Sequence, residues 1–214
     1  MEPDSSRYVP VPVEPLKIHP VTLQGCFVRL EPLSMDHHAG LCEVGLDEDL
    51  WRWIPHQVRT PDDMRAYIQT ALKAQGDGTA LPFATFEQAS GRVVGSTRFG
   101  NIDAPNRRVE IGWTWIGLPW QRTAVNTEAK YLMLRHAFET LGCLRVELKT
   151  DALNARSRAA ILRLGARQEG IFRNHSVTTS GRVRDSVYFS IIDTEWPEVR
   201  SNLEAKLSRP YPPR

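Results

Sequence analysis

The sequence predicts a single α/β domain, with a mixed and mostly antiparallel sheet and helices on both faces. Strand-like and helix-like segments follow one another in the order strand, two helices, three strands, helix, strand, helix, two strands, helix. Early antiparallel strands followed by a parallel crossover at the centre imply this mixed sheet. We expect residues 22–207 to form the domain, between a Pro-rich arm at residues 1–21 and a Pro-rich tail at residues 208–214.

Composition limits the classes of function. The chain has 214 residues, 41% hydrophobic and 24% charged, which is ordinary for a globular domain. Its net charge of +2 gives no reason to expect nucleic acid or a membrane as partner. Three cysteines without metal spacing favour a reducing compartment. The acidic, Pro-rich start is not a signal peptide, and no apolar run approaches the roughly 20 residues of a membrane helix. We therefore expect a cytoplasmic protein without a metal.

The first half of the chain predicts three strands and three helical segments. A strand over residues 27–31 precedes a helix from Met35 to about Leu46, which Ser34 can cap. Residues 47–55 form a loop or short helix, and Pro61 opens a helix to about Gln75. Residues 81–87 and 93–100 then form an antiparallel pair, followed by a turn at residues 101–106.

The segment from Arg108 to Leu141 organises the chain as a strand, a turn and a helix. Polar residues alternate in the strand with four apolar ones, Val109, Ile111, Trp113 and Trp115. Gly117 and Pro119 break the pairing, and apolar residues then recur at helical spacing from Val125 onward. Because unpaired N–H groups and the dipole favour anions at a helix start, this turn suits a phosphate.

The last third of the chain predicts a strand, a helix, a hairpin and a final helix. A strand at residues 145–151 leads to a helix that begins at Asn154 and ends at Gly165. Strands at residues 167–172 and 183–192 flank a turn. Thr194 can cap a C-terminal helix whose apolar face carries Trp196, Val199, Leu203 and Leu207. The Pro-rich arm and this apolar face make a homodimer an open possibility.

Three stretches resemble one family. EIGWTW, then WQRTAVNTEAKYLML, and later LKTDALNARSRAAILRLGA are similar to the GNAT superfamily of acyl-CoA-dependent N-acyltransferases. The likeness is closest to the branch of the ribosomal-protein N-terminal acetyltransferases and covers residues 22–207. It implies a sheet that splays between the family's fourth and fifth strands, with acetyl-CoA bound in the gap.

The resemblance also implies an acyl-CoA site. The family cradles the CoA pyrophosphate on a Gln/Arg-x-x-Gly-x-Gly/Ala turn, which here consists of Gln121, Arg122, Thr123, Ala124, Val125 and Asn126. Alanine and asparagine replace the commonest glycines, but alanine can keep helical torsions, so we expect binding to survive. Trp115, Ile116 and Gly117 match the strand that pairs with pantetheine. Asn154 matches the family's asparagine, is also a good helix N-cap, and precedes Ser157 and Arg158 near the CoA.

Direct acyl transfer to an amine needs a base, a polarised carbonyl and a proton for the leaving thiolate. Glu110 is the candidate base, and a surface ion pair with Arg108 or Arg145 is the alternative for it. The N–H near Ile116 is the candidate to polarise the carbonyl. The family's usual tyrosine acid is Ile161 here, so Ser157, Tyr188 or water remains to supply the proton. Ser157 is the catalytic candidate, and Cys143 is a distant option.

The acceptor side is predicted from the same branch. In this branch the first helical loop and the last hairpin surround the acceptor, which implies a pocket lined by Trp51, Trp53, Arg98, Asn101, Arg173 and His175. The alternative for the two tryptophans is packing in the core. The alternative for His175 is a structural role or simple exposure. The acceptor is an amine, either a peptide N-terminus or a small molecule. Succinyl-CoA as donor is a rival, for which Arg98 or Arg173 could supply the cation. A non-catalytic acyl-CoA-binding regulator is the second rival.

Overall fold

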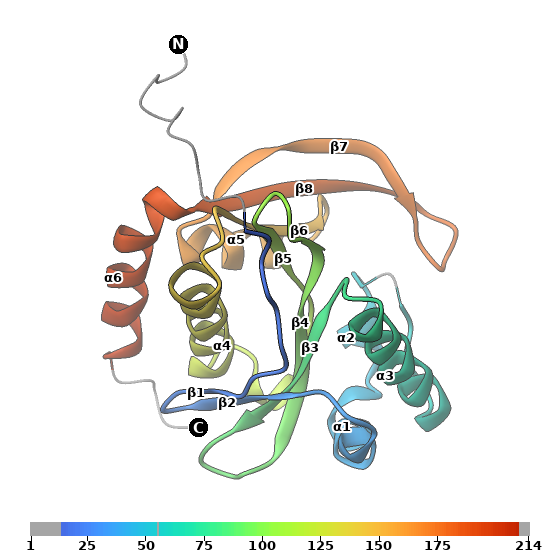
Figure 1. Cartoon of the computed structure of the whole chain (residues 1–214). Helices are drawn as coiled ribbons and strands as arrows, with labels where there is room; N and C mark the ends of the chain where they lie inside the picture. Colours follow the sequence, from blue (N-terminus) through green and yellow to red (C-terminus); the bar gives the residue numbers. More distant parts are fainter. Residues whose placement is uncertain (1–13, 55, 210–214) are drawn as a thin grey trace.

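The computed structural model describes residues 14–54 and 56–209, and its strands form one eight-stranded sheet (Figure 1). In sheet order the strands are β1 (Leu23–Gln24), β2 (Val28–Pro32), β3 (Leu81–Glu87), β4 (Val93–Asp103), β5 (Arg108–Ile116), β6 (Arg145–Asp151), β8 (Val183–Ile192) and β7 (Arg167–Val177). All neighbours are antiparallel except β5 and β6. The predicted mixed sheet is therefore confirmed. Most of the predicted arm, and the tail from residue 210, lie outside the described residues.

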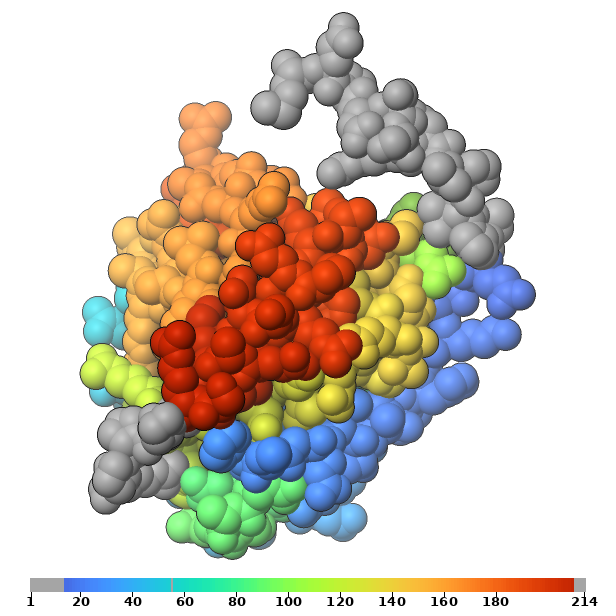
Figure 2. Space-filling model, turned by 90° about the vertical axis from the view of Figure 1, so that its left-hand side faces the viewer, coloured from blue at the N-terminus to red at the C-terminus, as the bar shows by residue number. Residues whose placement is uncertain are grey.

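Helices cover both faces of this sheet (Figure 1). On one face lie α1 (His38–Gly45), α2 (Glu48–Trp51) and α3 (Pro61–Gly76). On the other lie α4 (Ala124–Arg135), which continues as a π-helix (His136–Thr140), α5 (Ala155–Leu164) and α6 (Trp196–Leu207). Figure 2 shows α6 lying across the outside of this second layer. Within the described ranges, no helix combines the length and apolar character needed to cross a membrane.

Two apolar cores result from this arrangement. The larger core packs the sheet against α4, α5 and α6 and includes Phe83, Phe99, Met133, Phe189 and Leu203. The smaller core packs the opposite face against α1, α2 and α3 and includes Leu41, Met64, Ile68 and Trp115. Since each helix buries one apolar stripe, the two layers hold the sheet firmly between them.

The two central strands, β5 and β6, separate after a short paired stretch. β5 and β6 pair only from Arg108 to Glu110, opposite Arg145 to Glu147. Beyond Glu110, β5 continues to pair with β4, and β6 with β8. In the part of the chain that the structure describes, one edge of β5 from Ile111 onward therefore has no partner strand, which leaves the splayed gap.

A bulge in β5 changes which side chains face which helices. The register shifts between Ser96 and Arg98 of β4, and Trp113 has a φ of +50°. Ile111 packs in the larger core, whereas Trp115 packs in the smaller one. The predicted simple alternation, which put Ile111, Trp113 and Trp115 on one face, is therefore wrong, because a bulge adds one residue and reverses the phase.

Three further predictions about the elements are wrong. β4 continues to Asp103, so the predicted turn at residues 101–106 begins later, at the end of this strand. β7 extends to Val177 because it pairs with β8 along most of its length. Thr194 does not cap the last helix, since it lies inside a 3-10 turn (Asp193–Glu195) in which Glu195 accepts from the Ile192 N–H. By contrast, Asn154 caps α5 as predicted, and Ser34 caps a 3-10 helix (Met35–His37) that leads directly into α1.

Candidate active site

The N-terminus of α4 lies directly after β5 and its short 3-10 turn (Leu118–Trp120). Thr123 is the N-cap, and its hydroxyl accepts from the Val125 N–H at 3.3 Å. Arg122 has a φ of +62°, so the left-handed residue of this turn is an arginine. Neither Ala124 nor Asn126 has a positive φ, so neither position requires glycine for its torsions. The predicted turn can therefore present its amides to a phosphate.

Side chains around this turn add donors and positive charge. Gln121 donates to the Ile116 carbonyl at 2.9 Å and accepts a hydrogen bond from Arg156 of α5. Arg122 is exposed beside the same turn. Two guanidinium groups therefore flank the start of α4, where the helix dipole also favours an anion. These residues fit a pyrophosphate.

The free edge of β5 presents its backbone to the gap. The Gly117 N–H donates to Val94 at 2.8 Å, and Ile116 pairs with Gly95 of β4. Because successive residues of a strand direct their backbone groups to opposite edges, the Ile116 N–H points away from β4. Its carbonyl accepts from Gln121, as described above, on that same outer edge. This edge can pair with an extended ligand as another strand would.

The start of α5 is also close to the gap. Asn154 accepts from the Ser157 N–H at 3.0 Å, which confirms its capping role. Ser157 is half-buried in the first turn of α5, and Arg158 donates to the Ala152 carbonyl at 3.4 Å. No hydrogen bond within the described residues connects the Ser157 hydroxyl to Glu110.

Glu110 lies at the point where β5 and β6 separate, and only 3% of its surface is exposed. Its Oε2 accepts from Asn101 at 2.7 Å and forms an ion pair with Lys149 at 3.0 Å. Arg108 and Arg145 instead pair with Glu147, so the alternative partners predicted for Glu110 are wrong. A Cβ at Gly112 would lie 2.8 Å from Glu110 Oε1, so glycine leaves room for this carboxylate.

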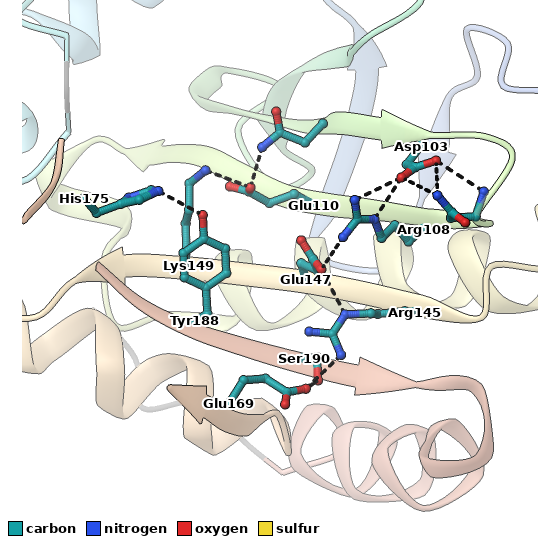
Figure 3. A network of polar contacts seen from close by, with 12 residues as sticks. Asp103, Arg108, Glu110, Arg145, Glu147, Lys149, Glu169, His175, Tyr188 and Ser190 are labelled. Atoms are coloured by element: carbon teal, nitrogen blue, oxygen red, sulfur yellow. Dashed lines mark hydrogen bonds and ion pairs between the residues drawn. The ribbon is translucent and has the colours of Figure 1, made fainter. Parts of the chain in front are cut away.

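Lys149 connects Glu110 to a group of aromatic residues (Figure 3). Its Nζ lies 5.7 Å from the ring centre of Tyr188 and 5.8 Å from that of Trp113. The Tyr188 hydroxyl lies 3.4 Å from Nε2 of His175, whose Nδ1 lies 3.0 Å from the Ser186 hydroxyl. Burial lowers the pKa of His175, and Lys149 lowers it further. Near pH 7 this histidine is therefore mainly neutral.

The predicted acceptor residues are only partly brought together. Asn101 and His175 join the group around Glu110 and Lys149, whereas Arg173 lies on the exposed outer part of β7. Trp53 is half-buried in the loop after α2, and its ring lies 5.8 Å from the guanidinium of Arg182, which directly precedes β8.

Trp51 does not line an open pocket, which corrects the prediction. It is 2% exposed, its indole N–H donates to the Gly45 carbonyl at 2.7 Å, and its ring packs on Trp115. Trp51 is the last residue of α2, and its ring is buried between Tyr67 of α3 and Trp115 of the sheet.

Arg98 lines a cavity of about 250 Å³ on the α3 side of the sheet. The cavity extends from Tyr67 of α3 to Thr179 in the turn of the β7–β8 hairpin. The guanidinium lies over the rings of Tyr67 and Trp113, at 5.2 and 5.1 Å. Trp113 thus lies near both Arg98 and Lys149, the ion-pair partner of Glu110.

Sequence reasoning missed three basic residues. No local motif marks Lys149 or Arg156 in the sequence, because the residues that they contact lie on other elements. Lys130 of α4 is buried, and its Nζ donates to Thr114 at 2.5 Å and to Thr97 at 3.1 Å. Burial lowers the pKa of Lys130 to about 7. A lysine inside the predicted helix was the available signal, but spacing alone did not show which face it occupies.

A sheet that splays beyond one short parallel pair, with a helix N-terminus at the opening, is the architecture of an acyl-CoA-dependent acyltransferase. The chain belongs to the GNAT family: the family model described as "Acetyltransferase (GNAT) domain" matches residues 28–167.

Individual relatives agree with this assignment. The chain is 33% identical over 106 residues to YdaF of Bacillus subtilis, which is named "putative ribosomal N-acetyltransferase"; the match covers 50% of this chain and 57% of YdaF. A solved GCN5-related N-acetyltransferase from Brucella melitensis is 33% identical, with a TM-score of 0.85 over 91% of this chain and 89% of that one. RimJ of Mycobacterium smegmatis, solved in complex with CoA-disulfide, is 23% identical, with a TM-score of 0.76 over 87% of this chain and 95% of that one.

Proposed function

We propose that the protein is an N-acyltransferase that moves an acetyl group from acetyl-CoA directly to a primary amine. The observation that carries this proposal is the position of Glu110. This buried carboxylate lies where the free edge of β5 begins, on the strand that leads to the phosphate-binding turn of α4. The end of the gap at the turn before α4 thus suits the pyrophosphate of a nucleotide. The end at Glu110 suits proton transfer.

The donor is held along the gap. The amides of residues 124–126, together with Arg122 and Arg156, bind the pyrophosphate, and Gln121 keeps the turn attached to β5. The edge formed by Trp115, Ile116 and Gly117 pairs with pantetheine, while Asn154 and Arg158 border it from α5. Acetyl-CoA supplies the activated thioester, and the Ile116 N–H polarises its carbonyl.

Glu110 receives the proton that the acceptor amine loses as the C–N bond forms and the C–S bond breaks. Its Oε1 is the oxygen that acts, because Lys149 and Asn101 both contact Oε2. The departing thiolate takes a proton from Ser157, from Tyr188 or from water. Tyr188 lies in the Lys149 group, and Ser157 lies at the start of α5.

The acceptor approaches from the α3 side of the sheet, past Trp53, Arg98, Asn101, Arg173 and His175. The name of YdaF supports a peptide N-terminus of the ribosomal kind as acceptor, and a small amine is the alternative. We place the enzyme in the cytoplasm, and we keep the homodimer as a proposal that light scattering of the purified protein tests.

Two rival functions have one observation each in their favour. A donor such as succinyl-CoA is favoured by Arg98, which is buried and has no carboxylate partner among the described residues. A non-catalytic acyl-CoA-binding regulator is favoured by Ile161, which is buried and supplies no acid where the family commonly has tyrosine.

Steady-state turnover of Glu110→Gln distinguishes the enzyme from the regulator. Wild type should acetylate a peptide with a free N-terminus, and the variant should lose at least about 100-fold in kcat while keeping its affinity for CoA. Glu147→Gln is the matched control, since Glu147 pairs with Arg108 and Arg145 outside the site. Equal turnover in wild type and Glu110→Gln would remove Glu110 as the base, and no turnover by wild type would favour the regulator.

A further inference from the structure

Arg98 is a buried cation without an acidic partner in the part of the chain that the structure describes. It is 4% exposed, and its Nε is buried without a hydrogen bond. Its contacts are the faces of Tyr67 and Trp113. Aromatic faces attract a guanidinium, but they do not replace the hydrogen bonds that its five N–H groups lose with water. A buried arginine therefore normally has a carboxylate partner.

Two carboxylates could pair with Arg98, but other groups hold each of them through one of its oxygens. Asp63 also lines the cavity, but one of its oxygens accepts from the backbone N–H groups of Arg59 and Thr60, both at 3.0 Å, in the capping box of α3. Glu110 is held by Lys149 and Asn101. Neither carboxylate forms an ion pair or a hydrogen bond with Arg98.

The cavity around Arg98 otherwise suits an anion. It is lined by Tyr67 and Thr70 of α3, by His56 and by Thr179 of the hairpin turn. Burial lowers the pKa of His56, and the positive charge of Arg98 lowers it further. The cavity thus contains one buried guanidinium and several groups that can donate a hydrogen bond, alongside the Asp63 carboxylate of the capping box.

The position of the cavity connects it to the reaction. The ring of Trp113 has Arg98 against it and Lys149 near it, and Lys149 holds Glu110. A group bound at Arg98 is therefore one aromatic side chain away from the residues around the proposed base. This reasoning rests on the proposed acyl transfer and adds the chemical class of a substrate.

We propose that Arg98 binds a carboxylate of one of the two substrates, in the cavity between α3 and the tip of the β7–β8 hairpin. The planar guanidinium matches a carboxylate through two parallel hydrogen bonds. Two sources supply the same chemistry: an acidic side chain near the N-terminus of a peptide acceptor, or the distal carboxylate of a dicarboxylic acyl-CoA such as succinyl-CoA.

The test compares carboxylate and amide substrates in two arms. In the acceptor arm, tetrapeptide amides with Asp or Asn at positions one to three are acetylated with acetyl-CoA, and kcat/KM is measured for each pair. In the donor arm, calorimetry compares the binding of succinyl-CoA and acetyl-CoA without an acceptor. Both arms use wild type, Arg98→Gln, Arg98→Lys and the control Arg65→Gln, which removes an exposed arginine from the same side of the molecule.

The proposal predicts that wild type prefers the carboxylate form at least about tenfold in one arm. Arg98→Gln should reduce this preference to less than about twofold, while Arg65→Gln keeps it and Arg98→Lys keeps part of it. Unfolding midpoints of the variants establish that each is folded. The arm that shows the preference identifies the source of the carboxylate.

Two results would overturn the proposal. One is a wild type that prefers the carboxylate in neither arm, and the other is a preference that survives in Arg98→Gln. Acetylation of the Asn peptides by wild type would in either case leave the proposed acyltransferase activity standing, so the two proposals fail separately.

Discussion

The Nζ of Lys149 lies 3.0 Å from Oε2 of Glu110, across the point where β5 and β6 separate. Glu110 is the last residue of β5 that pairs with β6, and Lys149 lies on β6 just beyond the paired part. Since both Lys149 and Asn101 bind the same oxygen, they fix the direction of the carboxylate and leave Oε1 to act. Lys149 is thus a positioning residue for the proposed base.

Lys149→Gln should therefore lower kcat about tenfold or more and leave the affinity for CoA unchanged, because the carboxylate loses its fixed direction. Measuring kcat and the CoA dissociation constant separately checks this. Lys73→Gln serves as control, since Lys73 forms an exposed pair with Asp77 on α3. A fully active Lys149→Gln would show that the ion pair has no part in catalysis.

Gly112→Ala should reduce activity through the same carboxylate. The added Cβ would meet Glu110 Oε1 at 2.8 Å, and a contact this short forces the side chain to move. Because Gly112 has no positive φ, alanine is tolerated by the backbone. We expect a fall in kcat of at least about tenfold with a nearly unchanged unfolding midpoint. Activity equal to wild type would show that Glu110 acts from another position.

Glu128 anchors the first hairpin of the sheet to α4. Its buried carboxylate accepts from the backbone N–H groups of Cys26, Phe27 and Val28, at 2.9, 2.6 and 2.7 Å. Glu128→Gln replaces one acceptor by an NH₂ group, so we expect a loss of about 2–4 kcal/mol in the free energy of unfolding. Denaturant titration checks this against Glu198→Gln on the exposed face of α6. A change below about 0.5 kcal/mol would contradict it.

Lys130 should make stability depend on pH. Burial lowers its pKa in the folded state to about 7, while the unfolded chain titrates near the ordinary value of 10.5. Between these values the unfolded state binds one more proton, so the free energy of unfolding rises with pH, by up to about 1.4 kcal/mol per pH unit. Lys130→Met should lack this rise and be the more stable protein near pH 7.

Urea titrations of both proteins between pH 7 and pH 10 measure the difference. The stability advantage of Lys130→Met should shrink steadily as the pH increases. Parallel curves for the two proteins would mean that Lys130 stays charged, with its hydroxyl partners Thr97 and Thr114 compensating its burial.

The sequence predicted correctly those helices whose ends are set by residues within a few positions of one another. The helix that Asn154 begins and Gly165 ends occurs as predicted, because a cap and a left-handed glycine act within a few residues. The helix opened by Pro61 agrees for the same reason. The length of β7 and the bulge at Trp113 depend on partner strands far away in the sequence, which no local pattern records.

The candidate site also contains some residues that the sequence could predict and others that it could not. The turn proposed to bind phosphate and the proposed base Glu110 could be named from the sequence because they lie in one continuous segment that resembles a known family. Lys149, Arg156 and the cavity at Arg98 arise where separate elements meet, so only the structure brings their side chains together. Trp51 shows the opposite case: the sequence suggested that it lines a pocket, but the structure packs it against Trp115 in the core.

The central claim is that acyl-CoA binds between the free edge of β5 and the start of α4. Titration calorimetry of the purified protein with acetyl-CoA tests it most directly, with the double variant Arg122→Gln/Arg156→Gln for comparison. We predict micromolar binding by wild type and a loss of about tenfold or more in the double variant, because two cations no longer face the phosphates. No binding by wild type, or equal binding by both proteins, would contradict the site described for this chain.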